Sequence, residues 1–98
     1  MDKGLKTIIS ELKSFKVLIK ERYKAEIIGV FGSYVRNEQK QSSDVDLLVR
    51  FFEGASLFDL VGLANYLEDA LHINVDIVSE RAIREELKET IYEEVVKI

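Results

Sequence analysis

The sequence contains no cysteine, which excludes a disulfide framework and a thiolate metal site and predicts a protein of the reducing cytoplasm. Its one histidine, His72, cannot form a zinc site by itself. No stretch approaches the roughly 18 apolar residues of a membrane span, and no signal peptide is visible, so no membrane partner is expected. Because the net charge is -4, we also expect no direct binding of nucleic acid.

The length of 98 residues is enough for one domain with a single core. It leaves no room for a separate substrate-recognition domain. We therefore expect residues 1–98 to form a single domain. The composition, 47% hydrophobic and 33% charged residues, is typical of a globular protein.

Hydrophobic periodicity predicts helices and strands in alternation along the chain. The expected elements are a helix over 2–24, a strand over 27–31, a short helix over 33–38, a strand over 45–52, a helix over 57–71, a strand over 73–78 and a helix after Ser79. Ser33 and Ser56 precede helices as caps, and Asp59 completes a capping box with Ser56. Residues 95–98 fit either the end of the last helix or an edge strand. This order predicts an α+β fold, a mixed sheet with helices packed mainly on one face.

A row of lysines follows the polar side of the predicted first helix: Lys13, Lys16, Lys20 and Lys24. Such a row is usually a solvated face, and we interpret it so. Docking of an acidic partner is the alternative. An exposed edge of the small sheet could likewise bind a partner or a second copy of the chain, which makes a homodimer another expected possibility.

The central motif is Gly32-Ser33, ten further residues, and Asp44-Val45-Asp46. Alternate residues of a strand point to the same face, so Asp44 and Asp46 should project together. Two carboxylates side by side repel each other and raise each other's pKa. A divalent metal ion between them would relieve this repulsion.

Asp76 is a third carboxylate in an otherwise apolar predicted strand, where aspartate is disfavoured. Hard cations such as Mg²⁺ prefer oxygen ligands, and two such ions about 4 Å apart clamp the attacking and leaving oxygens in nucleotidyl transfer. Gly32 would let the backbone approach a phosphate, and a helix N-terminus at Ser33 would direct N–H groups at it. Arg36 would add positive charge at the phosphates or pair with an aspartate.

Each of these features also has a purely structural interpretation. Asp-x-Asp pairs are most often turns or surface pairs, and a Gly-Ser turn after a strand is equally common. Tyr34 could stack on a base, but a packing role is the stronger expectation. The functional interpretation depends on the features occurring together in so short a chain.

The combined pattern resembles the minimal nucleotidyltransferases of the DNA polymerase beta superfamily, the small MntA-type proteins encoded beside HEPN-domain toxins. The matching residues are Gly32, Ser33, Asp44, Asp46 and Asp76, and Arg36 matches the common G-S-x-x-R extension. The sequence departs from the pattern at Asn37, where a glycine commonly follows the arginine. Asparagine tolerates left-handed geometry, so we expect the turn to survive.

The resemblance implies a palm-like nucleotidyltransferase sheet and an antitoxin that transfers AMP from ATP to a tyrosine of a HEPN ribonuclease. By this resemblance, Asp44 and Asp46 would be catalytic and bind both Mg²⁺ ions. Asp76 would complete one metal site and help to activate the tyrosine hydroxyl. Gly32 and Ser33 would hold the triphosphate, beside Arg36.

Two alternatives stay open. The chain could neutralise the toxin by binding alone, although the presence of all three aspartates argues against a decayed site. It could also modify a small molecule, as antibiotic nucleotidyltransferases do. Those enzymes carry an additional helical domain for the acceptor, and this chain has no room for one.

Overall fold

A four-stranded mixed sheet forms the centre of the computed structural model, which describes residues 4–98. The strands are β1 (Ala25–Phe31), β2 (Val45–Phe51), β3 (Val75–Ser79) and β4 (Val96–Lys97), in the order β3-β2-β1-β4. β1 is antiparallel to both β2 and β4, and β2 is parallel to β3. The expected α+β fold with a mixed sheet is confirmed, and residues 95–98 resolve in favour of the edge strand.

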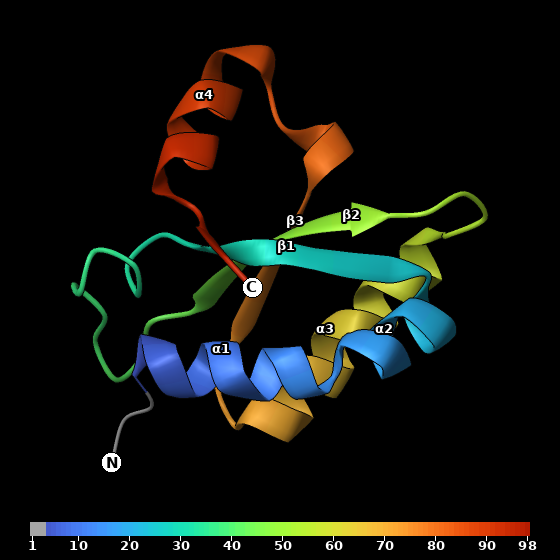
Figure 1. Ribbon diagram of the computed structural model, residues 1–98, viewed down its shortest axis with the longest axis horizontal. Helices are drawn as coiled ribbons and strands as arrows, with labels where there is room; N and C mark the ends of the chain where they lie inside the picture. The colour runs from blue at the N-terminus through green and yellow to red at the C-terminus, as the bar shows by residue number, and fades with distance from the viewer. Residues whose placement is uncertain (1–3) are drawn as a thin grey trace.

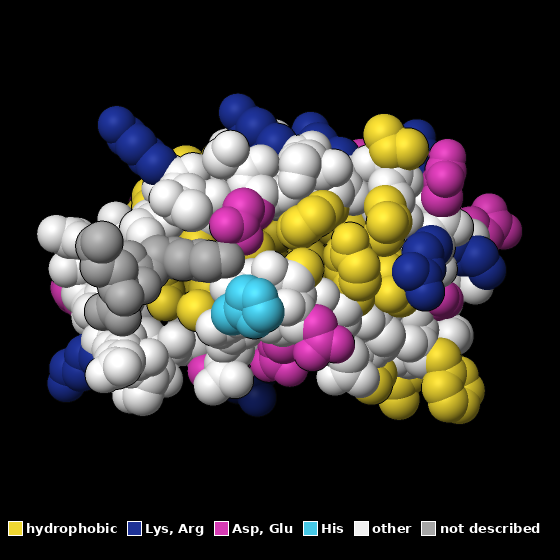
Figure 2. Space-filling view, turned by 90° about the horizontal axis from the view of Figure 1, so that it is seen from below, with side chains coloured by type: hydrophobic (Ala, Val, Ile, Leu, Met, Phe, Trp, Pro, Cys, Tyr) yellow, Lys and Arg dark blue, Asp and Glu magenta, His cyan; other side chains and the backbone are white. Residues whose placement is uncertain are grey.

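The helices lie mainly on one face of the sheet, as predicted (Figure 1). That face carries α1 (Leu5–Ser14), α2 (Lys16–Tyr23) and α3 (Leu57–Leu71), while α4 (Glu85–Glu94) stands on the other. Seen from the helix side, apolar side chains fill the middle of the surface, and Lys and Arg side chains gather along one border (Figure 2). Within residues 4–98, no helix is both long and apolar enough to cross a membrane.

The core lies between the sheet and the three helices. Val45, Leu47 and Val49 alternate along β2 and are fully buried on the helix side. Against them pack buried residues of all three helices, namely Ile8, Leu12, Ile19, Leu63, Leu67 and Leu71. The other face of β2 therefore carries the residues in between, Asp46, Leu48 and Arg50.

α3 has the predicted bounds, because a capping box defines its first turn. The Ser56 backbone N–H donates to the Asp59 carboxylate at 2.8 Å, and both halves of the predicted capping box are present. At the other end, His72 adopts a left-handed conformation (φ 58°) and is exposed, so it terminates the helix.

The first helix is not continuous, and this prediction was wrong. It is broken at Phe15, whose N–H bonds to the Leu12 carbonyl while its backbone leaves the helical region (φ -98°, ψ 0°). The Phe15 ring then packs edge-on against Tyr66 of α3, with ring centroids 5.6 Å apart. The break lets α2 turn toward α3. The first residues of the predicted span, 2–3, lie outside the described residues.

The short helix expected over 33–38 is also absent. A turn replaces it, in which the N–H groups of Val35 and Arg36 both donate to the Gly32 carbonyl. Asn37 ends the turn in the left-handed region (φ 58°), as expected for an asparagine at a position where glycine is common. Ser33 is therefore not the cap of a helix.

The last helix begins later than predicted. A single 3-10 turn, Glu80–Ala82, follows Ser79, and the chain is then extended at Ile83 (φ -73°, ψ 130°) before α4 begins at Glu85. The strand before it also starts later and ends later than the predicted 73–78. These shifts place α4 above the face of the sheet that carries Asp46 (Figure 1).

Candidate functional site

Asp46 and Asp76 lie side by side on neighbouring strands. They are direct partners in the parallel register of β2 and β3, so their side chains leave the same face of the sheet. This is the face opposite the core residues Val45 and Leu47. Asp46 is half-buried, whereas Asp76 and Asp44, which directly precedes β2, are exposed.

The carboxylates interact electrostatically. Burial, the negative charges of Asp76 and Asp44, and a hydrogen bond with Asp76 together raise the pKa of Asp46 from 3.8 to about 6, while the charge of Arg36 acts in the opposite direction. The repulsion predicted between Asp44 and Asp46 is therefore present, and burial and Asp76 contribute more to the shift than Asp44 does. Such a site takes up a proton or another cation readily.

Gly32 lies directly against this carboxylate. It follows β1 with a positive φ of 83°, and a Cβ atom placed on it would lie 2.0 Å from Oδ2 of Asp46. No other residue fits there without displacing Asp46. The sequence assigned glycine to close approach of a phosphate. The structure adds a reason that sequence reasoning missed, namely the room needed by the Asp46 side chain.

Within residues 4–98, Arg36 forms no ion pair with an aspartate. Its guanidinium donates to Glu38 (3.2 Å) and forms a short ion pair with Glu94 near the end of α4. The hydrogen bond with Glu38, and then that with Glu94, raise the pKa of Arg36 further above its usual range. The two glutamates were not singled out from the sequence. Glu94 is 58 positions from Arg36, and no local pattern links them.

The turn after β1 therefore differs from the predicted phosphate cradle. Because 33–38 is not helical, no helix N-terminus points its N–H groups at a ligand, and two of these groups bond back to Gly32. Ser33 remains next to Gly32 and is half-buried. Tyr34 is 6% exposed and belongs to the core, which confirms the packing interpretation.

The donor set suits a hard cation better than a soft one, because all three candidate ligands are carboxylates. As the side chains stand in residues 4–98, no three His, Cys, Asp or Glu residues already form a group that could hold a metal ion. What the fold does bring together is the Asp46–Asp76 pair. Asp44 acts on Asp46 through its charge.

Comparison with known proteins identifies the family. A family model described as a nucleotidyltransferase domain matches residues 6–98. The chain belongs to this nucleotidyltransferase family. One relative is the protein adenylyltransferase MntA of Thermococcus cleftensis, 43% identical over 94 residues, which covers 96% of this chain and 95% of the relative. The family inferred from the Gly-Ser and Asp-x-Asp motifs is thereby confirmed.

Solved structures support the same assignment. One described as a candidate minimal nucleotidyltransferase matches with a TM-score of 0.83 and 36% identity, covering 98% of this chain and 97% of the other. A toxin–antitoxin crystal structure with AMP-PNP matches with a TM-score of 0.67 and 25% identity, over 83% of this chain and 67% of that chain. The nucleotidyltransferase fold is therefore shared over nearly the whole of this sequence.

Proposed function

We propose that this protein is a cytoplasmic, Mg²⁺-dependent adenylyltransferase that transfers AMP from ATP to a tyrosine of a HEPN-domain toxin and thereby acts as its antitoxin. The observation that carries the proposal is the Asp46–Asp76 pair, with Gly32 packed directly against the Asp46 carboxylate. It is supported by a relative named for protein adenylyltransfer and by a similar chain in a toxin–antitoxin structure with AMP-PNP.

In this proposal Asp44, Asp46 and Asp76 hold two Mg²⁺ ions. The chemistry of the donors fits this role, because a half-buried carboxylate with a pKa near 6 and a carboxylate neighbour is stabilised by added positive charge. When bound, Mg²⁺ would neutralise the charge that develops on the phosphate oxygens. Asp44 and Asp46 would be ligands of both ions, and Asp76 would complete one of the two sites.

The triphosphate binds at the turn after β1, through Gly32, Ser33 and Arg36. The absence of a Cβ at Gly32 leaves the backbone next to Asp46 open to an approaching phosphate. Arg36 is half-exposed and already held near the site, since its charge acts on the Asp46 carboxyl. Phosphate oxygens would replace Glu38 and Glu94 as its partners.

We place the acceptor tyrosine on the partner protein, because a chain of similar fold occurs in a toxin–antitoxin structure with AMP-PNP. Asp76 is the exposed member of the pair, so a hydroxyl arriving from solvent can donate a hydrogen bond to it. The tyrosine hydroxyl passes its proton to Asp76 while its oxygen bonds to the α-phosphorus of ATP. The bond between the α-phosphorus and the oxygen that bridges it to the β-phosphorus breaks, and diphosphate leaves with that oxygen.

The test is transfer to the HEPN protein encoded by the neighbouring gene, with ATP labelled at the α-phosphate and Mg²⁺. We expect the label on a tyrosine of the partner, located by mass spectrometry. The double variant Asp44→Ala plus Asp46→Ala should abolish labelling. Asp69→Ala, which removes an exposed carboxylate on α3, serves as the matched control and should label normally.

Loss of the toxin's ribonuclease activity is measured in the same reactions. If the double aspartate variant neutralises the toxin as well as the wild-type chain does, the protein acts by binding alone. If the toxin is never labelled although an added small hydroxyl compound is, the acceptor is a small molecule. Either result would reject the proposal.

A further inference from the structure

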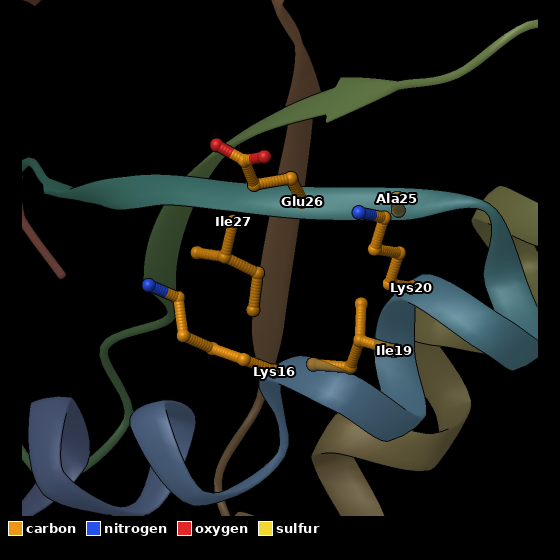
Figure 3. A pocket seen from close by; sticks show the side chains of 6 residues that line it. All are labelled: Lys16, Ile19, Lys20, Ala25, Glu26 and Ile27. Atoms are coloured by element: carbon orange, nitrogen blue, oxygen red, sulfur yellow. The ribbon is translucent and has the colours of Figure 1, made fainter.

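The helices on the two faces of the sheet are attached to it in different ways. On the core face, Ile19 of α2 points toward β1, and Ile27 of β1 points back toward α2 (Figure 3). Both residues are almost completely buried. On the other face, none of the residues of α4 is buried, and its Leu87 is half-exposed. Burial of apolar surface therefore holds α2 on the sheet, whereas it contributes little to holding α4.

Polar contacts hold α4 instead. The Tyr92 hydroxyl donates to the Glu80 carboxylate at 2.7 Å, and Glu80 in turn forms an ion pair with Arg50 of β2 at 2.9 Å. Near the end of α4, Glu94 forms an ion pair with Arg36. Ion pairs close to solvent contribute little to stability, so a local displacement of α4 requires little free energy.

α4 is joined to the rest of the chain by extended residues at both ends. Arg84 precedes it with φ -64° and ψ 142°, and Val95 follows it with φ -63° and ψ 133°. Directly after Val95, β4 lies very close to β1, because a Cβ atom placed on Gly29 would be 2.3 Å from the Val96 carbonyl oxygen. Rotation about the backbone bonds of Arg84 and Val95 would therefore move α4 while β4 stays paired.

Arg36 links α4 to the proposed triphosphate site. Its half-exposed guanidinium donates to Glu38 at 3.2 Å and is also bound by Glu94. These two carboxylates occupy N–H donors that phosphate oxygens would use. The Glu38 side chain is 63% exposed, so it can turn into solvent when a phosphate arrives. The Glu94 side chain is only 22% exposed.

The partial burial of Glu94 connects nucleotide binding to the position of α4. If a triphosphate bound Arg36, the Glu94 carboxylate would lose its cation while it remained partly buried beside the negative phosphates. An unpaired charge is unfavourable in such a place, and the like charges repel each other. Glu94 can regain its hydration only if the last turn of α4 moves away from Arg36.

We propose that α4 is a lid above the sheet face that carries Asp46, held in place by the Arg36–Glu94 ion pair and released when a nucleoside triphosphate binds Arg36 (Figure 1). Glu94 and the phosphates compete for the same guanidinium. Because such coupling is reciprocal, breaking the ion pair strengthens nucleotide binding by the factor by which the nucleotide favours release of α4. The inference rests on the proposed function, since it requires the triphosphate to bind at Arg36.

The test measures binding of α,β-methylene ATP, in the presence of Mg²⁺, to the whole chain by calorimetry. This analogue cannot be cleaved between its α- and β-phosphates. Glu94→Gln should bind it about three- to tenfold more tightly than wild type, because the nucleotide no longer has to break an ion pair. Glu93→Gln is the matched control, since it removes the same charge from an exposed neighbour that forms no ion pair within residues 4–98. It should bind within about twofold of wild type, because solvent and salt screen its charge.

A double-mutant cycle with Arg36→Gln shows whether the effect of Glu94 passes through Arg36. In that background Glu94→Gln should lose most of its effect on nucleotide affinity, because Glu94 has no cation left to hold. An equal gain in affinity in both backgrounds would overturn the inference, since it would reflect general charge repulsion.

Amide hydrogen exchange follows α4 itself. Its amides should exchange faster when the analogue is bound, and also in free Arg36→Gln, while the amides of α3 should stay unchanged. If the analogue binds but Glu94→Gln binds it no more tightly, or exchange in α4 does not rise, the lid is refuted and the proposed function stands. If the analogue does not bind the wild-type chain at all, the proposed nucleotide site is refuted together with the lid.

Discussion

The two faces of β2 differ in what they contribute: one packs in the core, and the other carries carboxylates of the candidate site. On one face Val45, Leu47 and Val49 are fully buried against the helices, and on the other Asp46 is half-buried beside Asp76. Residues one position apart thus differ in what they contribute. The apolar face stabilises the fold, whereas the carboxylates on the other face, next to the buried Leu48, are repelling charges that oppose it. Stability and chemistry are separated by the period of two along a single strand.

Asp46→Asn should show the largest difference between an effect on activity and an effect on stability. We expect AMP transfer to the partner to fall by about a thousandfold or more, equivalent to roughly 4 kcal/mol of transition-state stabilisation. Stability should be unchanged or higher, because the substitution removes a partly buried charge next to another carboxylate. Initial rates and thermal unfolding measured on the same samples check both parts. A clear drop in melting temperature would contradict the separation.

Leu47→Ala is the matching change on the other face, one residue away. Removing a fully buried leucine side chain should lower the free energy of unfolding by about 2–5 kcal/mol, through lost burial and the cavity left behind. Transfer activity should be nearly normal at temperatures where the variant is folded. Denaturant unfolding gives the first quantity. A variant as stable as wild type would show that this face is not the core.

Gly32→Ala should lower activity through a change in packing at the candidate site. The new Cβ would displace the Asp46 carboxylate, so we expect activity to fall by about ten- to a hundredfold, since small misplacements of reacting groups cost about that much. Gly54→Ala is the control, because Gly54 also has a positive φ (91°) but its nearest neighbour is the Lys24 side chain at 3.7 Å. Equal losses of activity in both variants would indicate backbone strain alone.

The smallest expected effect is the dependence of Mg²⁺ affinity and of stability on pH that Asp46 causes. Because its pKa in the folded state is raised from 3.8 to about 6, Mg²⁺ must displace a proton below about pH 6, and its affinity should fall about tenfold per pH unit there. The stabilisation from this proton is present below pH 3.8 and lost as the pH rises through about 6. Asp46→Asn should therefore make the free energy of unfolding depend less on pH between 3.8 and about 6. Calorimetric Mg²⁺ titration at several pH values measures the first effect, and an affinity independent of pH would exclude it.

Local sequence signals predicted best where no distant contact intervenes. α3 has its predicted bounds because Ser56 and Asp59 cap it directly. The prediction of one continuous first helix was wrong at Phe15, which packs on Tyr66 some fifty residues away. The short helix after Gly32 failed because Asn37 turns left-handed and Arg36 is drawn to two glutamates, one of them on α4.

The sequence by itself determined the family and the residue types of the candidate site, because a Gly-Ser turn, Asp-x-Asp and a later strand aspartate form a recognisable pattern. It also placed Asp44 and Asp46 on one face of a strand, since alternation along a strand is local. Only the tertiary structure decided that Asp76 lies beside Asp46, that Gly32 makes room for that carboxylate, and that Arg36 is held by Glu94. Each of these depends on strand register or on contacts between distant segments. Neither is encoded by the spacing of residues along the chain.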